Sequence, residues 1–213
     1  MVLLGVCAAV DALSLHTGFR LRTLVRGLPY GEVAQSELER MQRMELLYGL
    51  AGIAQLIALV ATCVAFLVWF YRSRLNAEYF DAGRQRMSRG WTIGGWFVPV
   101  VSLWFPKKIA NDIWDTSTPA APDGTVPERL PGGVLNSWWV MFLLAMMLGR
   151  LSSQDYERAE TLGEIEGAIT SGLFADGAGI LAAVLAIRVV SKLTAMQHTL
   201  HEQRLGAPAA DPR

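Results

Sequence analysis

The longest uncharged stretch of the chain, Leu46–Tyr71, constrains the fold more than any other feature. It holds 26 consecutive residues without Asp, Glu, Lys or Arg, whereas a helix needs about 20 apolar residues to cross a bilayer. Residues 130–149 also carry no charge, and residues 167–187 carry only that of Asp176. Only 18% of the whole chain is charged, against about 25% in a soluble domain. These stretches therefore predict a membrane protein.

The N-terminal residues 2–19 are also apolar. They lack the basic segment that begins a secretory signal peptide, and Asp11 interrupts them, so we interpret them as a first spanning helix. The sequence thus predicts an all-α, polytopic bundle of membrane helices. We expect spans at 2–19, 46–71, 135–153 and 168–190, within one integral membrane domain at 1–197 that a polar tail follows at 198–213.

Residues Gly90–Pro106 form a further uncharged stretch, which glycine and proline interrupt. Its 17 residues are at the short limit for a span, and Pro99 lacks the amide hydrogen that a continuous helix uses. We expect the stretch either to re-enter the membrane or to cross it as a proline-kinked fifth span. Either topology puts 12 Lys and Arg residues inside and 7 outside, so the excess of positive charge in cytoplasmic loops does not decide. Basic residues on both flanks favour re-entry, with the N-terminus inside.

The segments on either side of this stretch are polar and basic. The sequence KKIANDIW at 107–114 places Ile109, Ile113 and Trp114 near one helical face, which predicts an amphipathic helix in the membrane interface. Residues 72–89 carry five arginines and two acids. We expect a solvated loop there, and contact with anionic lipid head groups is compatible with it.

Four stretches carry a distinctive combination of residues: RSRLNA at 72–77, SRGW at 88–91, GGWFVPVVSLWFPKKIANDIW at 94–114 and IRVVSKLTAMQ at 187–197. Together they resemble an uncharacterised actinobacterial membrane family, domain of unknown function 4328. The resemblance extends from the first helix to about Gln197, and Ser102 stands where it leads us to expect asparagine. It implies a multi-pass membrane protein and no particular activity. Its most specific part is a central motif of Trp91, Trp96, Pro99, Trp104, Pro106, Asn111, Asp112 and Trp114.

Ionisable side chains inside apolar stretches are costly and mark candidate functional positions. Asp176 is the strongest candidate, and Asp11 and Arg150 are the others. The two aspartates are expected to approach each other or to pair with Arg150 or Arg188. A carboxyl group packed in the bundle without any further role explains Asp176 equally well. Three glycines leave room around it for water, an ion or a neighbouring helix: Gly172, Gly177 and Gly179.

Other reactive residues give weaker signals. His198, His201 and Glu202 have a spacing that can hold a metal, but a solvated helix face explains them better. Cys7 and Cys63 are interpreted as small apolar residues. The sequence contains no phosphate-binding loop, dinucleotide-binding glycine motif or HExxH motif. We therefore predict no enzymatic activity, metal or cofactor, and the formal net charge of zero gives no indication of nucleic acid binding.

These features predict a multi-pass protein of the cell membrane that acts as an interaction or membrane-organising module. Small residues recur along two of the expected spans, and they allow helices to approach closely in lipid. The expected partners are the bilayer and another membrane protein or a second copy of the chain. The alternative is a small transporter or channel that uses Gly90–Pro106 and Asp176, because broken helices and buried carboxylates occur together at transport sites.

Overall fold

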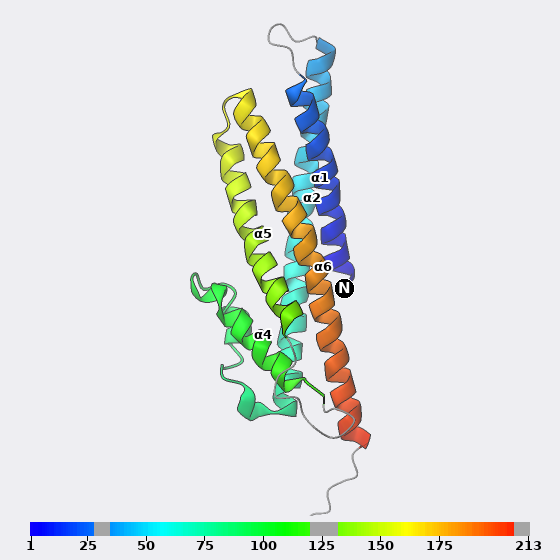
Figure 1. Ribbon diagram of the computed structural model, residues 1–213, viewed down its shortest axis with the longest axis vertical. Helices are drawn as coiled ribbons and strands as arrows, with labels where there is room; N and C mark the ends of the chain where they lie inside the picture. The colour runs from blue at the N-terminus through cyan, green and yellow to red at the C-terminus, as the bar shows by residue number, and fades with distance from the viewer. Residues whose placement is uncertain (28–34, 120–131, 207–213) are drawn as a thin grey trace, which may run out of the picture. The chain divides into compact units, whose positions relative to one another are not determined.

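The computed structural model describes residues 1–27, 35–119 and 132–206. These residues form helices and no strand. Four of the helices are long and apolar enough to cross a membrane, which confirms the predicted all-α bundle. They are α1 (Val2–Arg26), α2 (Gln35–Phe80), α5 (Gly133–Arg158) and α6 (Leu162–Gly206) (Figure 1).

The backbone between α2 and α5 forms only short helices in its described part. They are η1 (Ala82–Arg84), α3 (Trp91–Gly94), η2 (Val101–Leu103) and α4 (Phe105–Thr116). Residues Gly90–Pro106 therefore contain no helix of spanning length, and the expectation of a kinked fifth span is wrong. Three glycines and two prolines at this spacing interrupt the helical hydrogen bonding. Re-entry into the membrane stays a prediction.

The long helices extend beyond the predicted spans. The 46 residues of α2 have a length of about 69 Å at 1.5 Å per residue, roughly twice the hydrocarbon thickness of a bilayer. The loop expected at 72–89 begins only after Phe80. Residues 198–206 of the expected polar tail belong to α6, and residues 207–213 lie outside the described part.

The early start of α6 has a local cause that we did not predict. Thr161 Oγ1 accepts a hydrogen bond from the backbone N–H of Glu164 at 3.3 Å, and Glu164 Oε2 accepts one from the N–H of Thr161 at 3.0 Å. This reciprocal pair is a capping box, which satisfies amide groups that the first helical turn leaves open. The helix therefore starts at Leu162 rather than near residue 168.

The chain divides into two compact units, which we describe separately. The first unit contains residues 1–63 and 138–186, and in it α5 and the first half of α6 run side by side (Figure 1). Part of its core consists of Leu21, Val25 and Ile169, against which Met41, Met44, Tyr48 and Ile165 pack. The prediction of one integral membrane domain remains untested.

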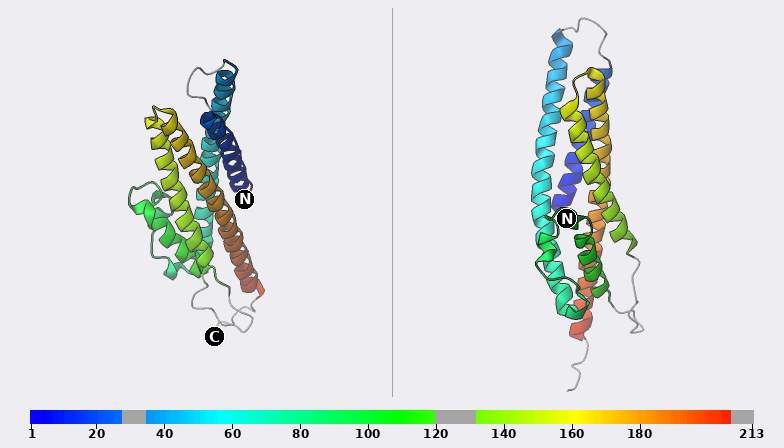
Figure 2. Two further views of the ribbon diagram at one scale, coloured as in Figure 1. Left: turned by 45° about the horizontal axis from the view of Figure 1, so that its top comes forward. Right: turned by 90° about the vertical axis from the view of Figure 1, so that its left-hand side faces the viewer.

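The second unit contains residues 64–137 and 187–213. Here α4 lies beside the C-terminal parts of α2 and α6 (Figure 2). The apolar residues of α4 are almost completely buried, with exposed fractions of 0% for Ile113 and 1% for Ile109 and Trp114. Helix α4 is thus part of the core of this unit.

Candidate functional site

A single amide group links the two predicted intramembrane aspartates in the first unit. Gln55 Nε2, on α2, donates hydrogen bonds to Asp11 Oδ1 on α1 at 3.0 Å and to Asp176 Oδ1 on α6 at 2.8 Å. The structure therefore brings the two aspartates to one bridging residue. Arg150 lies exposed on α5. The expected pairing of an aspartate with Arg150 is therefore absent from the described part. We call Asp11, Gln55 and Asp176 the polar cluster.

Gln55 was not among the predicted residues, because it carries no charge. Gln55 lies within the long uncharged stretch of α2, and no Asn or other Gln accompanies it between Leu46 and Tyr71. A lone amide in a spanning helix needs a hydrogen-bond partner, because lipid offers none. That signal was present in the sequence, although it does not reveal which residues the amide binds.

Glycine makes the polar cluster sterically possible. A Cβ atom at Gly179 would lie 2.8 Å from Asp11 Oδ2, whereas a Cβ atom at Gly177 would meet nothing within 4 Å. The absence of a side chain at Gly179 therefore lets α1 approach α6 at the level of Asp11. Of the three glycines expected to leave room around Asp176, Gly172 and Gly179 form close interhelical approaches.

Polar contacts at two further places join helices of the first unit. Cys7 Sγ on α1 lies 3.1 Å from Thr62 Oγ1 on α2, and the Thr62 hydroxyl donates to the carbonyl of Leu3 at 3.2 Å. Near the other end of α1, Arg22 and Arg26 both form ion pairs with Glu166 of α6. Because Glu166 pairs with both arginines, α1 can continue past residue 19 with basic side chains.

The polar cluster has the chemistry of a proton or cation site. Asp176 Oδ2 is buried and has no hydrogen-bond partner among the described residues. A carboxylate at membrane depth is costly unless it is paired, protonated or hydrated. Gln55 donates to both carboxyl groups, so it stabilises them without supplying a positive charge. No group of three His, Cys, Asp or Glu in the described part could hold a metal ion.

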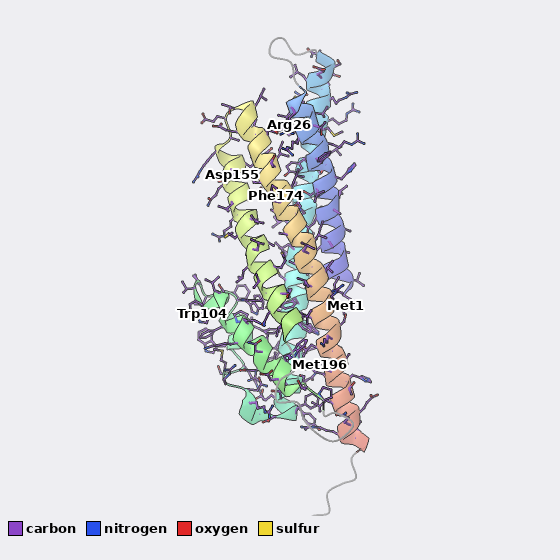
Figure 3. The ribbon with its side chains drawn as sticks, viewed as in Figure 1. Met1, Arg26, Trp104, Asp155, Phe174 and Met196 are labelled. Atoms are coloured by element: carbon purple, nitrogen blue, oxygen red, sulfur yellow. The ribbon has the colours of Figure 1, made fainter. Side chains whose placement is uncertain are left out.

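The central motif belongs to the second unit, where its residues split into two groups. Trp96 packs edge-on against Phe66 and Phe70, with ring centroids 5.5 and 5.9 Å away, and Pro106 is buried in the first turn of α4. Pro99, Trp91 and Trp104 are exposed; Trp104 immediately precedes α4 (Figure 3). Part of the motif thus builds the core, and part of it is presented outward.

Helix α4 corrects the prediction of an amphipathic helix in the membrane interface. Its apolar face is Ile109, Ile113 and Trp114, as the helical spacing predicts, but the protein covers that face. The ammonium group of Lys192 lies 5.4 Å from the centre of the Trp114 ring, a cation–π contact. The pattern correctly predicted an apolar face, and it could not predict whether lipid or protein covers it.

Asp112 is buried on α4 and bound by a basic residue from the preceding segment. Arg86 Nε donates to Asp112 Oδ1 at 2.9 Å, and this pairing raises the pKa of Arg86. On the adjacent turn Lys107 Nζ donates to Asn111 Oδ1 at 3.0 Å. Burial lowers the pKa of Lys107 to about 8, with Asp115 acting in the opposite direction. Asn111 and Asp112 of the central motif, and Lys107 beside it, therefore form specific contacts within this unit.

The Arg86–Asp112 pair predicts an asymmetric response to mutation. Asp112 is 5% exposed and Arg86 is 63% exposed, so Arg86→Ala leaves a buried carboxylate, which costs about 1–3 kcal/mol. Asp112→Asn leaves an exposed guanidinium in water and should cost less. Thermal unfolding in detergent should therefore rank Arg86→Ala as the less stable variant, and the double variant should recover stability relative to Arg86→Ala. Equal losses in the two single variants would contradict this ranking.

Gln197 joins three segments of the second unit, and the sequence analysis gave it no role. Its Nε2 donates to the carbonyl of Ser73 at 2.9 Å and to Ser117 Oγ at 3.1 Å, while its Oε1 accepts from Asn76 Nδ2 at 3.0 Å. Ser73 and Asn76 lie in RSRLNA, and Gln197 ends IRVVSKLTAMQ. Two of the stretches that carry the family resemblance thus meet at one buried amide.

Comparisons with known proteins give one result. The family model described as "Domain of unknown function (DUF4328)" matches residues 33–195, which is more than half of the 213-residue chain. Helix α1 and Asp11 precede the matched region, so the expected match from the first helix onward is too long. Neither the comparison with curated proteins nor that with solved structures finds a match. The extent of the family match, with the whole central motif inside it, shows that the chain belongs to the DUF4328 family.

Proposed function

We propose that this chain is a multi-pass protein of the cell membrane, of the actinobacterial type that its sequence resembles, and that it acts as an interaction or membrane-organising module. Four helices with spanning length and composition support the membrane location. Polar links between the helices support a fixed bundle, because Gln55 and Glu166 each bind two side chains from other parts of the chain. The bilayer and a second copy of the chain are its proposed partners.

The four-helix topology supports one orientation. With residues Gly90–Pro106 not crossing, an N-terminus inside puts 12 Lys and Arg residues in the cytoplasm and 7 outside, and the opposite orientation reverses these numbers. Because cytoplasmic loops carry the excess of positive charge, we place both termini and the segment between α2 and α5 in the cytoplasm.

The single observation that best supports self-association is an exposed surface of α2 that contains a glycine. It comprises Gln42, Glu45, Leu46, Gly49, Leu50 and Ile53. All six residues belong to one helix, and Gly49 has no atom near its missing Cβ. A glycine on a lipid-facing helix lets a second helix approach closely, so this surface fits an α2 helix of another copy.

A leucine at Gly49 should weaken that association. Gly49→Leu adds a large side chain to this surface, and Gly5→Leu is a matched control, because Gly5 is exposed on α1 with nothing near it. Energy transfer between donor- and acceptor-labelled copies in proteoliposomes should fall for Gly49→Leu and stay unchanged for Gly5→Leu. Absence of energy transfer at every protein-to-lipid ratio in the parent chain would contradict self-association.

A small transporter or channel is the second candidate function. The polar cluster favours it, because Asp176 presents a buried carboxyl oxygen without a hydrogen-bond partner in the described part. Such a group can bind a proton or a cation on its way across the membrane. In this proposal Gln55 holds the two carboxyl groups at a fixed separation while one of them is loaded.

Proton flux separates the two functions. Proteoliposomes that contain the purified chain and an entrapped pH-sensitive dye are given a pH gradient. The interaction module predicts the same slow leak for the parent chain, Asp176→Asn and protein-free vesicles. Flux that requires the parent chain and disappears in Asp176→Asn would overturn the interaction module in favour of the transporter.

A further inference from the structure

Residues 91–104 form a compact segment with an apolar outer surface in the second unit, which we call the apolar tip. Its inner side is fixed to the protein by Thr92, Gly95 and Trp96. A Cβ atom at Gly95 would lie 3.3 Å from the Cβ of Phe105, so the segment packs directly against the start of α4. Its outer side carries seven large exposed side chains: Trp91, Ile93, Phe97, Val98, Val100, Leu103 and Trp104.

The backbone of the apolar tip is suited to a lipid environment. Every backbone N–H from Trp91 to Trp104 donates to a carbonyl within Ser88–Val101, apart from Pro99, which has none, and Val100. Irregular backbone is normally excluded from lipid because its amide groups lack partners there. Here the successive short turns supply those partners within the segment itself. The tip can therefore face lipid without leaving most of its donors open.

A strained residue lies at the turn of this segment. Val100 has φ 68° and ψ −53°, and the Val101 N–H donates to the Pro99 carbonyl at 2.7 Å, which defines a γ-turn of the rare, strained type. A β-branched residue at positive φ is unusual, and the surrounding structure must hold it in this conformation. The turn reverses the chain at its most apolar point, where Phe97 and Val100 are 70% and 62% exposed.

Basic side chains flank the apolar tip at both ends, and they differ in whether an acidic side chain of the same unit pairs with them. On the N-terminal side Arg86 binds Asp112 and Arg89 binds Glu78, so acids of the same unit already neutralise them in part. On the C-terminal side Lys108 is exposed at the first turn of α4. An apolar surface with tryptophans at its edge and an exposed lysine beside it matches the chemistry of a lipid head-group region.

We propose that residues 91–104 insert as a shallow apolar wedge into one leaflet of the bilayer, with Lys108 contacting anionic head groups. The occupant of this surface is the lipid leaflet itself. On insertion, lipid acyl chains surround the seven apolar side chains. Both flanks of the segment stay on the same side of the membrane. This role is independent of self-association through α2.

Site-specific fluorescence on the full-length chain in proteoliposomes tests the insertion. An environment-sensitive dye is attached in a Cys7→Ala, Cys63→Ala background at Phe97→Cys, with Leu205→Cys as a matched position, since Leu205 is also a large exposed residue. The dye at 97 should be quenched by brominated acyl chains and lose quenching by aqueous iodide, whereas the dye at 205 should show the reverse. Iodide quenching at 97 equal to that at 205 would overturn the proposal, as would cross-linking between copies through Phe97→Cys.

Two flanking positions separate insertion from crossing. Ser88→Cys and Lys108→Cys are exposed positions on either side of the tip, and a membrane-impermeant thiol reagent should label both from the same side. Labelling from opposite sides would overturn the wedge.

The head-group contact is tested with vesicles of phosphatidylcholine and phosphatidylglycerol in which one or the other is brominated. Quenching at 97 should be stronger from the brominated anionic lipid, and Lys108→Gln should reduce that preference about fivefold, because one lysine near an anionic surface contributes about 1 kcal/mol. Equal quenching by the two lipids in the parent chain would overturn the head-group contact.

Discussion

Replacing Trp114 by alanine should destabilise the protein by about 3–5 kcal/mol, the range for removing a large aromatic residue from a packed core. Trp114 is 1% exposed, and Ile109 and Ile113 on the same face of α4 are equally buried. The substitution opens a cavity between α4 and the rest of its unit, and it removes the ring that Lys192 covers. Thermal unfolding of the purified chain in detergent, followed by circular dichroism, measures the loss.

Two further variants test whether the loss comes from the burial of the Trp114 ring. Trp114 Nε1 is buried without a hydrogen-bond partner among the described residues, so Trp114→Phe should cost much less than Trp114→Ala, because it keeps most of the apolar volume. Trp104→Ala removes a tryptophan of the same motif that is 45% exposed and should change stability by less than about 1 kcal/mol. A loss for Trp104→Ala as large as that for Trp114→Ala would show that α4 is not packed as described.

The four long helices could be predicted because a bilayer excludes charge over a fixed thickness. Leu46–Tyr71 has the length and composition of a spanning segment, and its helix forms as expected. The helix ends could not be predicted in the same way. Polar residues beyond each apolar stretch remain helical because they find distant partners, as Arg22 and Arg26 do with Glu166, 144 and 140 residues away.

The central stretch shows a different limit of sequence reasoning. Its glycines and prolines indicated broken backbone correctly, and the spacing of Ile109, Ile113 and Trp114 predicted the apolar face of α4. Neither pattern carries information about what covers an apolar face. Asp112 shows the same limit, because Arg86 makes the burial of its carboxylate tolerable and the helical spacing does not reveal that partner.

The polar cluster was predicted in part. An approach of the two intramembrane aspartates was one of the expected alternatives, and the structure brings Asp11 and Asp176 to one amide. Gln55 was missed because it carries no charge. Its role depends on the rotation of α2 relative to α1 and α6, and the close approaches of small residues set that rotation.

Gly172→Ala should destabilise the first unit by about 1–3 kcal/mol, the usual cost of inserting a group into filled space. A Cβ atom there would lie 2.8 Å from the Tyr48 hydroxyl oxygen and 3.3 Å from Ser152 Oγ. Tyr48 cannot simply move aside, because its ring also lies 3.1 Å from the position of a Cβ at Gly18 on α1. The matched control is Gly177→Ala on the same helix, where open space and the better helix propensity of alanine predict no loss. Melting temperatures in detergent compare the two variants.

Tyr48→Phe identifies the atom responsible for that loss. It removes the hydroxyl group that a Cβ at Gly172 would meet, so it should restore much of the stability lost in Gly172→Ala. A Cβ at Gly18 would instead meet ring carbons of Tyr48, the nearest being Cε2, which phenylalanine retains. Tyr48→Phe should therefore leave Gly18→Ala unrescued. If both alanine variants recover equally, the ring of Tyr48 is not held between the two glycines, and the packing of α2 between α1 and α6 must differ from that described.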